Sequence, residues 1–163
     1  MNEEGEAMQV SLEYLGEKKF KANTAKSSYI LDCKEITPVE YFATGIIGCT
    51  GIDLVVMAEK DGYAISNYKV SAEIERQMEV PMKFASLHIT YEFEGSFDAR
   101  KGERYILASL ESYCTTINSI RDSVKITYTI VYNGEKIADK ESIASGGGGS
   151  IEMDDGFGGA CCS

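Results

Sequence analysis

Residues 37–60 read TPVEYFATGIIGCTGIDLVVMAEK, and this stretch decides the fold. Thr37 suits an N-cap, Pro38 suits the first helical position, and Glu40 closes a Thr-x-x-Glu capping box. An Asp-Gly pair follows the stretch and ends the pattern, so a helix is expected over residues 38–60. Nearly all of it is apolar, and a helix that is apolar all round is normally buried inside a protein.

A membrane span is the alternative for this helix. Tyr41 to Ala58 gives 18 mostly apolar residues, at the lower edge of a spanning length. Asp53 would cost about 2.5–3.5 kcal/mol inside a bilayer. Several glycines and threonines also dilute the hydrophobicity, and only Lys60 provides a basic flank. We therefore expect a core helix and no membrane partner.

Three glycines, Gly45, Gly48 and Gly51, leave one stripe of this helix without side chains. Glycine costs up to about 1 kcal/mol at an interior helix position, so such a stripe needs a packing reason. The usual reason is a second backbone at close range. Because the sequence predicts only one other helix, the expected partner is the same helix of a second copy, in a homodimer.

The rest of the chain alternates between strand and helix patterns. A second helix is expected over Lys101–Arg121, where apolar residues recur at helical spacing. The expected strands are Met8–Leu15, Lys18–Asn23, Ser28–Leu31, Tyr63–Glu75, Leu87–Phe93, Val124–Tyr132 and Glu135–Ile143. This order predicts an α+β fold with antiparallel sheets, in one domain over residues 1–144. Residues 145–163 are rich in glycine and acids and are expected to form a flexible tail.

The charge of the chain excludes some partners. Its 16 Lys and Arg residues face 26 Asp and Glu residues, which gives a net charge of −10 at pH 7. Nucleic-acid binding relies on basic residues that neutralise phosphates, so no nucleic-acid partner is expected. The N-terminus lacks the apolar segment of a signal peptide, so we expect a cytoplasmic location in which cysteines remain thiols.

The chain has five cysteines but no metal-binding pattern. The cysteines are Cys33, Cys49, Cys114, Cys161 and Cys162. None forms a Cys-x-x-Cys motif, and the single histidine, His88, falls on the expected exposed face of a strand, so neither a metal nor a cofactor is predicted. Cys33 follows a short strand and is expected to be an ordinary packing or surface thiol.

Cys49 and Cys114 lie on or near the buried faces of the two expected helices. Taken singly, each is best explained as inert packing, because free cysteine is often buried. Taken together, two such thiols could reduce a peroxide. One attacks the O–O bond as a thiolate and becomes a sulfenic acid, and the second condenses with it to a disulfide. This chemistry also needs a positive group and an apolar pocket.

Several stretches resemble the OsmC/Ohr family, which comprises osmotically inducible protein C and organic hydroperoxide resistance proteins. Residues 37–42, followed by Gly-Cys-Thr at 48–50, are similar to the first helix of that family. Residues 84–95 resemble the strand before its second helix, and residues 104–114 resemble its second-cysteine helix. The resemblance covers roughly residues 8–143.

This resemblance implies a fold, an activity and partners. The family fold is an intertwined homodimer in which antiparallel sheets wrap around two helices, with the long first helix central. Cys49 falls at the peroxidatic, attacking position and Cys114 at the resolving position. The substrate would be a small organic hydroperoxide, and electrons would come from a dithiol reductant of the lipoyl or thioredoxin type.

The activating groups of the organic hydroperoxide resistance branch are not evident in this sequence. That branch uses an N-terminal arginine and a glutamate just after the helix-start proline. Here Val39 follows the proline, and Glu40, a candidate supporting residue that the capping box also explains, comes one place later. No arginine precedes Arg76. The arginines that could replace the missing cation are Arg76, Arg100 and Arg104.

Asp53 is a second candidate supporting residue. It lies four positions after Cys49, on a neighbouring part of the helix surface. A carboxylate beside a thiol raises the thiol pKa, which works against a thiolate. Asp53 could instead pair with a basic residue at the dimer contact.

Two other functions stay open. A non-enzymatic relative could bind a small apolar ligand in the same dimer-interface pocket, with Cys49 as a core residue. The adjacent Cys161 and Cys162 of the tail could carry electrons to a Cys49–Cys114 disulfide, sense redox state or bind a soft metal ion. The terminal Cys-Cys-Ser also resembles a Rab-type prenylation end, and a tail with incidental cysteines is the plain alternative.

Overall fold

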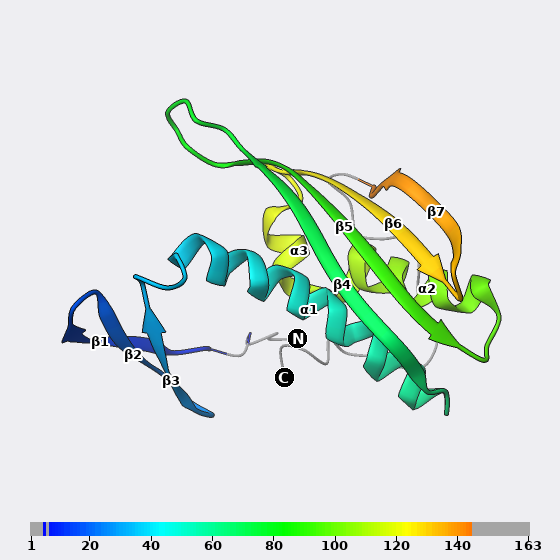
Figure 1. The fold of residues 1–163 in the computed structure, drawn as a ribbon, viewed down its shortest axis with the longest axis horizontal. Helices are drawn as coiled ribbons and strands as arrows, with labels where there is room; N and C mark the ends of the chain where they lie inside the picture. The colour runs from blue at the N-terminus through cyan, green and yellow to red at the C-terminus, as the bar shows by residue number, and fades with distance from the viewer. Residues whose placement is uncertain (1–4, 6, 145–163) are drawn as a thin grey trace. The chain divides into compact units, whose positions relative to one another are not determined.

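The computed structural model describes residue 5 and residues 7–144 (Figure 1). The chain divides into two compact units, Met1–Thr44 and Gly45–Ser163. The boundary falls inside helix α1 (Pro38–Lys60), whose first turns belong to the first unit and whose remainder belongs to the second. The expected core helix is therefore present with the bounds that its capping box and its Asp-Gly stop predict.

The first unit is a small antiparallel sheet followed by the start of α1. Its strands β1 (Val10–Gly16), β2 (Lys19–Thr24) and β3 (Ser28–Asp32) pair in the order β1-β2-β3. Strand β1 forms where the alternating sequence pattern predicts it, yet Val10 and Leu12 are each more than half exposed. Taken by itself, the unit therefore leaves apolar side chains uncovered.

The capping box at the start of α1 forms as the sequence predicts. The Thr37 N–H donates to Glu40 Oε2 at 2.8 Å, and the Glu40 N–H donates to Thr37 Oγ1 at 3.2 Å. The hydrogen bond from the Thr37 N–H, together with one from the Thr37 hydroxyl to Glu40 Oε2 at 2.8 Å, holds the pKa of Glu40 below its usual range. Glu40, which we expected to support the cysteine, uses its carboxylate to cap the helix.

The second unit contains a four-stranded sheet in the order β4-β5-β6-β7. Its strands are β4 (Ile65–Arg76), β5 (Phe84–Gly95), β6 (Lys125–Tyr132) and β7 (Glu135–Ser142). Two hairpins, β4–β5 and β6–β7, are antiparallel as expected, but the central pair β5–β6 is parallel. The helical segment between β5 and β6 provides the crossover that parallel neighbours need (Figure 1).

That crossover differs from the single helix expected over Lys101–Arg121. It consists of α2 (Ala99–Ala108), the π-helical turn η1 (Ser109–Tyr113) and α3 (Thr115–Ile120). Asp98 caps α2, because its side chain accepts a hydrogen bond from the Arg100 N–H at 2.8 Å. The break falls at Cys114, whose ψ of 107° is extended rather than helical.

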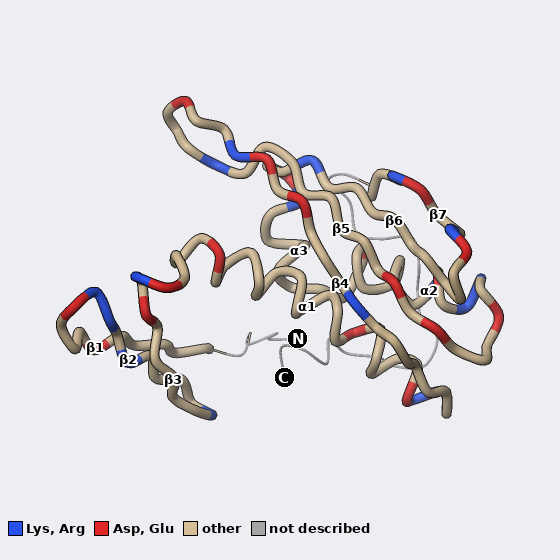
Figure 2. The backbone as a smooth tube through the Cα atoms, viewed as in Figure 1, with Lys and Arg blue, Asp and Glu red and all other residues tan. Residues whose placement is uncertain are grey.

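The core of the second unit forms between the sheet, α1 and the crossover. Its largest fully buried side chains include Tyr91 and Phe93 from β5 and Leu54 from α1. By length and composition α1 could cross a membrane, with a mean hydropathy of 1.6, and it bears few charged residues (Figure 2). Thr50 and the Gly51 carbonyl of α1 nevertheless form hydrogen bonds with Tyr91 and Tyr68 of the sheet, so α1 is the core helix of this fold.

The three glycines of α1 do not form one equivalent stripe. A Cβ on Gly51 would lie 3.0 Å from Val70 Cγ1, so Gly51 allows β4 to approach the helix within the same chain. A Cβ on Gly45 or Gly48 would meet nothing within 4 Å. Contacts within the chain therefore explain Gly51. Only Gly45 and Gly48 still require another backbone packed at close range.

Candidate functional site

The structure brings Cys49 and Cys114 together. Cys49 lies in the middle of α1 and Cys114 lies at the break between η1 and α3. Their thiols share a hydrogen bond, and neither forms a disulfide. Cys49 is 9% exposed and Cys114 is 0% exposed, so a reagent from solvent would meet Cys49 first.

The two cysteines meet because the segment around Cys114 runs along α1 in the opposite direction. Before Cys114, the Ser109 hydroxyl donates to Asp53 Oδ2 at 2.7 Å and lies 2.9 Å from Thr50 Oγ1. After it, Thr116 Oγ1 donates to the Ile46 carbonyl at 3.3 Å. The thiol pair therefore lies between two sets of hydrogen bonds that join the same two segments.

The surroundings of Cys114 keep its thiol protonated. The pKa of Cys114 is raised to about 12: burial is the largest cause and Cys49 adds to it, while hydrogen bonds with Thr116 and the Ile117 backbone partly offset the rise. Part of the effect of Cys49 is electrostatic, the repulsion between two negative sulfur atoms. The buried Cys114 is therefore a protonated thiol at neutral pH.

A chain of buried polar groups adjoins the thiols. Tyr91 Oη lies 2.6 Å from Thr50 Oγ1, and the chain continues through Ser109 to Asp53. All four residues are at most 1% exposed. Burial raises the pKa of Tyr91 well above its usual value, so its phenol stays neutral and can donate or accept a hydrogen bond.

Sequence reasoning identified Asp53 but missed the hydroxyl groups around it. Thr50 and Ser109 are polar residues on otherwise apolar helix faces, and this pattern could have marked them. Tyr91 follows the same alternation as its apolar neighbours in β5, so nothing in the sequence distinguished it from core.

The arginines proposed as replacement cations do not act on Cys114. Arg76, Arg100 and Arg104 are all exposed, and none affects the pKa of Cys114. Arg121 is buried, but its guanidinium pairs with Glu111 at 2.9 Å. In the described part of the chain, no lysine or arginine therefore favours a thiolate at Cys114.

The other candidate residues lie apart from this site or outside the described residues. Cys33 is a half-buried free thiol just after β3. His88 is half-buried rather than exposed, with Nδ1 2.7 Å from Thr127 Oγ1 and Nε2 3.1 Å from Thr129 Oγ1. Cys161 and Cys162 lie outside the described residues. Among residues 7–144, no group of three or more His, Cys, Asp or Glu side chains could hold a metal ion.

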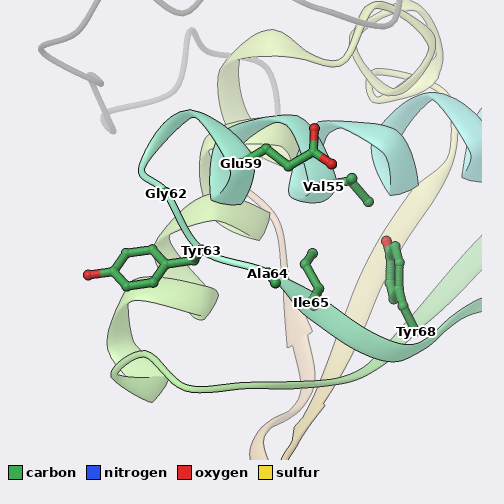
Figure 3. A pocket seen from close by; sticks show the side chains of 7 residues that line it. All are labelled: Val55, Glu59, Gly62, Tyr63, Ala64, Ile65 and Tyr68. Carbon is green, nitrogen blue, oxygen red and sulfur yellow. The ribbon is translucent and has the colours of Figure 1, made fainter.

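A pocket of about 430 Å³ lies beside the outer face of α1 (Figure 3). Val55 and Glu59 project from the helix on one side, and Tyr68 projects from β4 on the other (Figure 3). The lining residues are Val55, Glu59, Gly62, Tyr63, Ala64, Ile65 and Tyr68. Tyr68 also links this pocket to α1, because its hydroxyl donates a hydrogen bond to the Gly51 carbonyl at 2.8 Å.

The fold agrees with the comparisons to known proteins. The family model described as OsmC-like protein matches residues 31–129, which is more than half of the chain. The chain therefore belongs to the OsmC-like protein family. No curated protein matches it.

Solved structures share this fold at low sequence identity. A hypothetical protein from Aquifex aeolicus has a TM-score of 0.69 at 22% identity, covering 79% of this chain and 99% of its own. An OsmC-like protein from Mycoplasma pneumoniae has a TM-score of 0.65 at 13% identity, with coverages of 78% and 97%. An organic hydroperoxide resistance protein OsmC from Legionella pneumophila has a TM-score of 0.54 at 15% identity, with coverages of 77% and 96%.

Proposed function

We propose that this protein reduces small organic hydroperoxides with its thiol pair, Cys49 attacking and Cys114 resolving. The observation that carries the proposal is the hydrogen bond between the two buried thiols. A pair in contact needs little movement to become a disulfide. Membership of the OsmC-like family and the name of the Legionella relative support the same chemistry.

Each step of the proposed reaction balances. The Cys49 thiolate attacks the outer oxygen of the hydroperoxide, the O–O bond breaks, and the alkoxide takes up a proton to leave as an alcohol. Cys49 is then a sulfenic acid. The Cys114 sulfur attacks it, water leaves, and a disulfide forms. A dithiol reductant of the lipoyl or thioredoxin type restores both thiols and becomes a disulfide itself.

The order of attack follows from the surroundings of the two sulfur atoms. Cys49 is the thiol with some exposure, whereas Cys114 is fully buried and retains its proton. A hydroperoxide would therefore meet Cys49 first, and the protonated Cys114 would wait for the sulfenic acid. Because the resolving step needs the Cys114 sulfur as a thiolate and the pKa of Cys114 is raised, we expect turnover to rise as the pH increases above neutrality.

We also propose that the protein acts as a cytoplasmic homodimer. The outer face of α1 carries open space at Gly45 and Gly48 beside Ile52, which is 43% exposed. The first unit by itself also leaves Val10 and Leu12 uncovered. A second copy of the chain would cover these apolar surfaces. Cys49 and Cys114 in the thiol form fit a reducing compartment.

Peroxide consumption by matched serine variants tests the proposal. The substrate is cumene hydroperoxide and the reductant is dihydrolipoamide. We expect turnover by the wild type, none above background by Cys49→Ser, and a single oxidation without efficient recycling by Cys114→Ser. Cys33→Ser serves as the control and should match the wild type. Equal rates for Cys49→Ser and the wild type would contradict the proposal.

Binding of a small apolar molecule is a second candidate function. The pocket beside α1 favours it, since Val55, Ile65 and Tyr68 give it a mainly apolar lining. Calorimetric titration with uncharged aromatic ligands would detect such binding. A ligand whose affinity falls in Val55→Glu but not in Cys49→Ser, in a protein that consumes no hydroperoxide with any dithiol, would favour this function.

A further inference from the structure

We infer that Ser109 and Asp53 are positioning residues that set the stability of the Cys49–Cys114 disulfide, and thus the reduction potential of the pair. The inference rests on the proposed function, because it takes these cysteines to be the redox pair. It adds a role for two residues that are buried away from solvent and joined to each other by a hydrogen bond.

Ser109 connects both segments that carry a cysteine. Its hydroxyl donates to Asp53 Oδ2 at 2.7 Å, and Asp53 lies one helical turn after Cys49 in α1. Its carbonyl accepts the Cys114 N–H at 2.9 Å, which closes the π-helical turn η1. The position of Cys114 along α1 is therefore linked through one residue to the turn of helix that holds Cys49.

The buried hydrogen bond between Ser109 and Asp53 carries a desolvation cost that apolar packing would avoid. Removing a carboxylate or a hydroxyl from water is unfavourable unless partners replace the lost water contacts. Apolar side chains of similar volume could hold α1 and η1 together as well. Apolar contacts would not fix the relative position of the two segments as narrowly, because the distance between the donor and acceptor of a hydrogen bond can vary by only a few tenths of an ångström.

A disulfide needs this directional control. The two sulfur atoms must approach to about 2.05 Å with a narrow range of dihedral angles, and deviations make the bond easier to reduce. The contact from Thr116 to the Ile46 carbonyl fixes the other side of Cys114. With both contacts present, Cys114 cannot slide along α1, and the two thiols keep a high effective concentration toward each other.

The test measures the dithiol–disulfide equilibrium in glutathione buffers. All proteins carry Cys33→Ser, Cys161→Ser and Cys162→Ser, so that only one pair can react. One S–S bond forms between Cys49 and Cys114, the S–S bond of oxidised glutathione breaks, and the two protons end on two molecules of reduced glutathione. Circular dichroism confirms that each variant is folded under the same conditions.

The variants separate positioning from general stability. Ser109→Ala and Asp53→Leu remove the contact, whereas Asp53→Asn retains an oxygen that can accept the Ser109 proton. Tyr132→Phe is the matched control, since Tyr132 is also buried and donates a hydrogen bond to the Phe97 carbonyl at 2.6 Å, within the sheet and its following loop.

We expect Ser109→Ala and Asp53→Leu to lower the equilibrium constant for disulfide formation about tenfold, which is about 30 mV for two electrons. Asp53→Asn and Tyr132→Phe should stay within about threefold of the parent protein, which is less than half of that shift. Equal potentials for Ser109→Ala and Tyr132→Phe would overturn the inference.

The test distinguishes a failure of the positioning role from a failure of the proposed function. If the parent protein consumes hydroperoxide and forms the disulfide, but the variants have equal potentials, only the positioning role is wrong. If the parent protein forms no Cys49–Cys114 disulfide in any glutathione buffer, both the positioning role and the resolving role of Cys114 are wrong.

Discussion

The thiols of Cys49 and Cys114 share a hydrogen bond although 65 positions separate them in the chain. The contact joins the middle of α1 to the point where the crossover leaves its π-helical turn. Cys114 is fully buried there and burial raises its pKa to about 12. In the proposed reaction the partly exposed Cys49 therefore attacks, and the protonated Cys114 resolves.

The glycines of α1 give the first prediction. Gly51→Ala places a methyl group 3.0 Å from Val70 Cγ1, within the same chain. Overpacking of this kind costs about 1–3 kcal/mol. Alanine's higher helix propensity offsets about 1 kcal/mol of that cost, so the free energy of unfolding should fall by up to about 2 kcal/mol. Urea denaturation followed by circular dichroism measures the change.

Gly48→Ala is the matched control for Gly51→Ala and also tests the proposed dimer. Within one chain the added methyl meets nothing within 4 Å, and alanine favours a helix over glycine by up to about 1 kcal/mol. If a second copy packs against this face, the methyl should instead weaken the dimer, which sedimentation equilibrium would show as a higher dissociation constant. An unchanged dissociation constant would place the dimer contact elsewhere.

The buried ion pair of Arg121 and Glu111 gives the second prediction. Its atoms lie 2.9 Å apart and both side chains are less than 10% exposed. Arg121→Met should lower the free energy of unfolding by about 3–5 kcal/mol, because it leaves a buried carboxylate without its partner. The exposed pair of Lys136 and Asp139 is the control, and Lys136→Met should cost less than about 1 kcal/mol.

Thermal and urea unfolding of these two variants are compared side by side. Similar losses in Arg121→Met and Lys136→Met would contradict the assignment of Arg121 as a structural residue.

The pKa of Cys114 gives the third prediction. The pKa of the Cys114 thiol is near its ordinary value of 9.0 when the chain is unfolded and about 12 when it is folded. Because the folded pKa is the higher one, the folded state binds the proton more tightly, and its contribution to stability is fully present below pH 9 and lost as the pH rises toward 12. Cys114→Ala should therefore lose less stability than the wild type between pH 8.5 and pH 10.5, measured by urea denaturation.

Tyr91 responds in the same direction, because burial raises its pKa as well. The comparison of Cys114→Ala with the wild type cancels this contribution, since Tyr91 is present in both proteins. An identical dependence on pH in the two proteins would mean that Cys114 ionises as readily in the folded state as in the unfolded state.

Local signals in the sequence predicted most of the elements. The capping box of Thr37 and Glu40 and the following Asp-Gly pair define α1 from residues near its ends. The hairpin of β6 and β7 forms around Asn133 and Gly134, whose positive φ angles explain the choice of these residues. Such features depend on neighbours in the chain, so sequence reasoning can find them.

Features that depend on distant contacts were not predictable. The apolar stripe of the second helix continues through Leu110, Cys114 and Ile117, so the break at Cys114 leaves no trace in the periodicity. The parallel pairing of β5 and β6 depends on how the crossover packs. The family resemblance, and not the spacing, indicated that Cys49 and Cys114 act together, and the hydrogen bonds of Ser109 emerged only from the structure.

The most direct test of the account traps the first product at Cys49. Reduced Cys114→Ser protein receives one equivalent of cumene hydroperoxide in the presence of dimedone, which labels sulfenic acids, and peptides are then identified by mass spectrometry. The account predicts the label on Cys49, and a Cys49–Cys114 disulfide in the wild type treated in the same way. A label confined to Cys33, Cys161 or Cys162, with Cys49 unmodified, would contradict it.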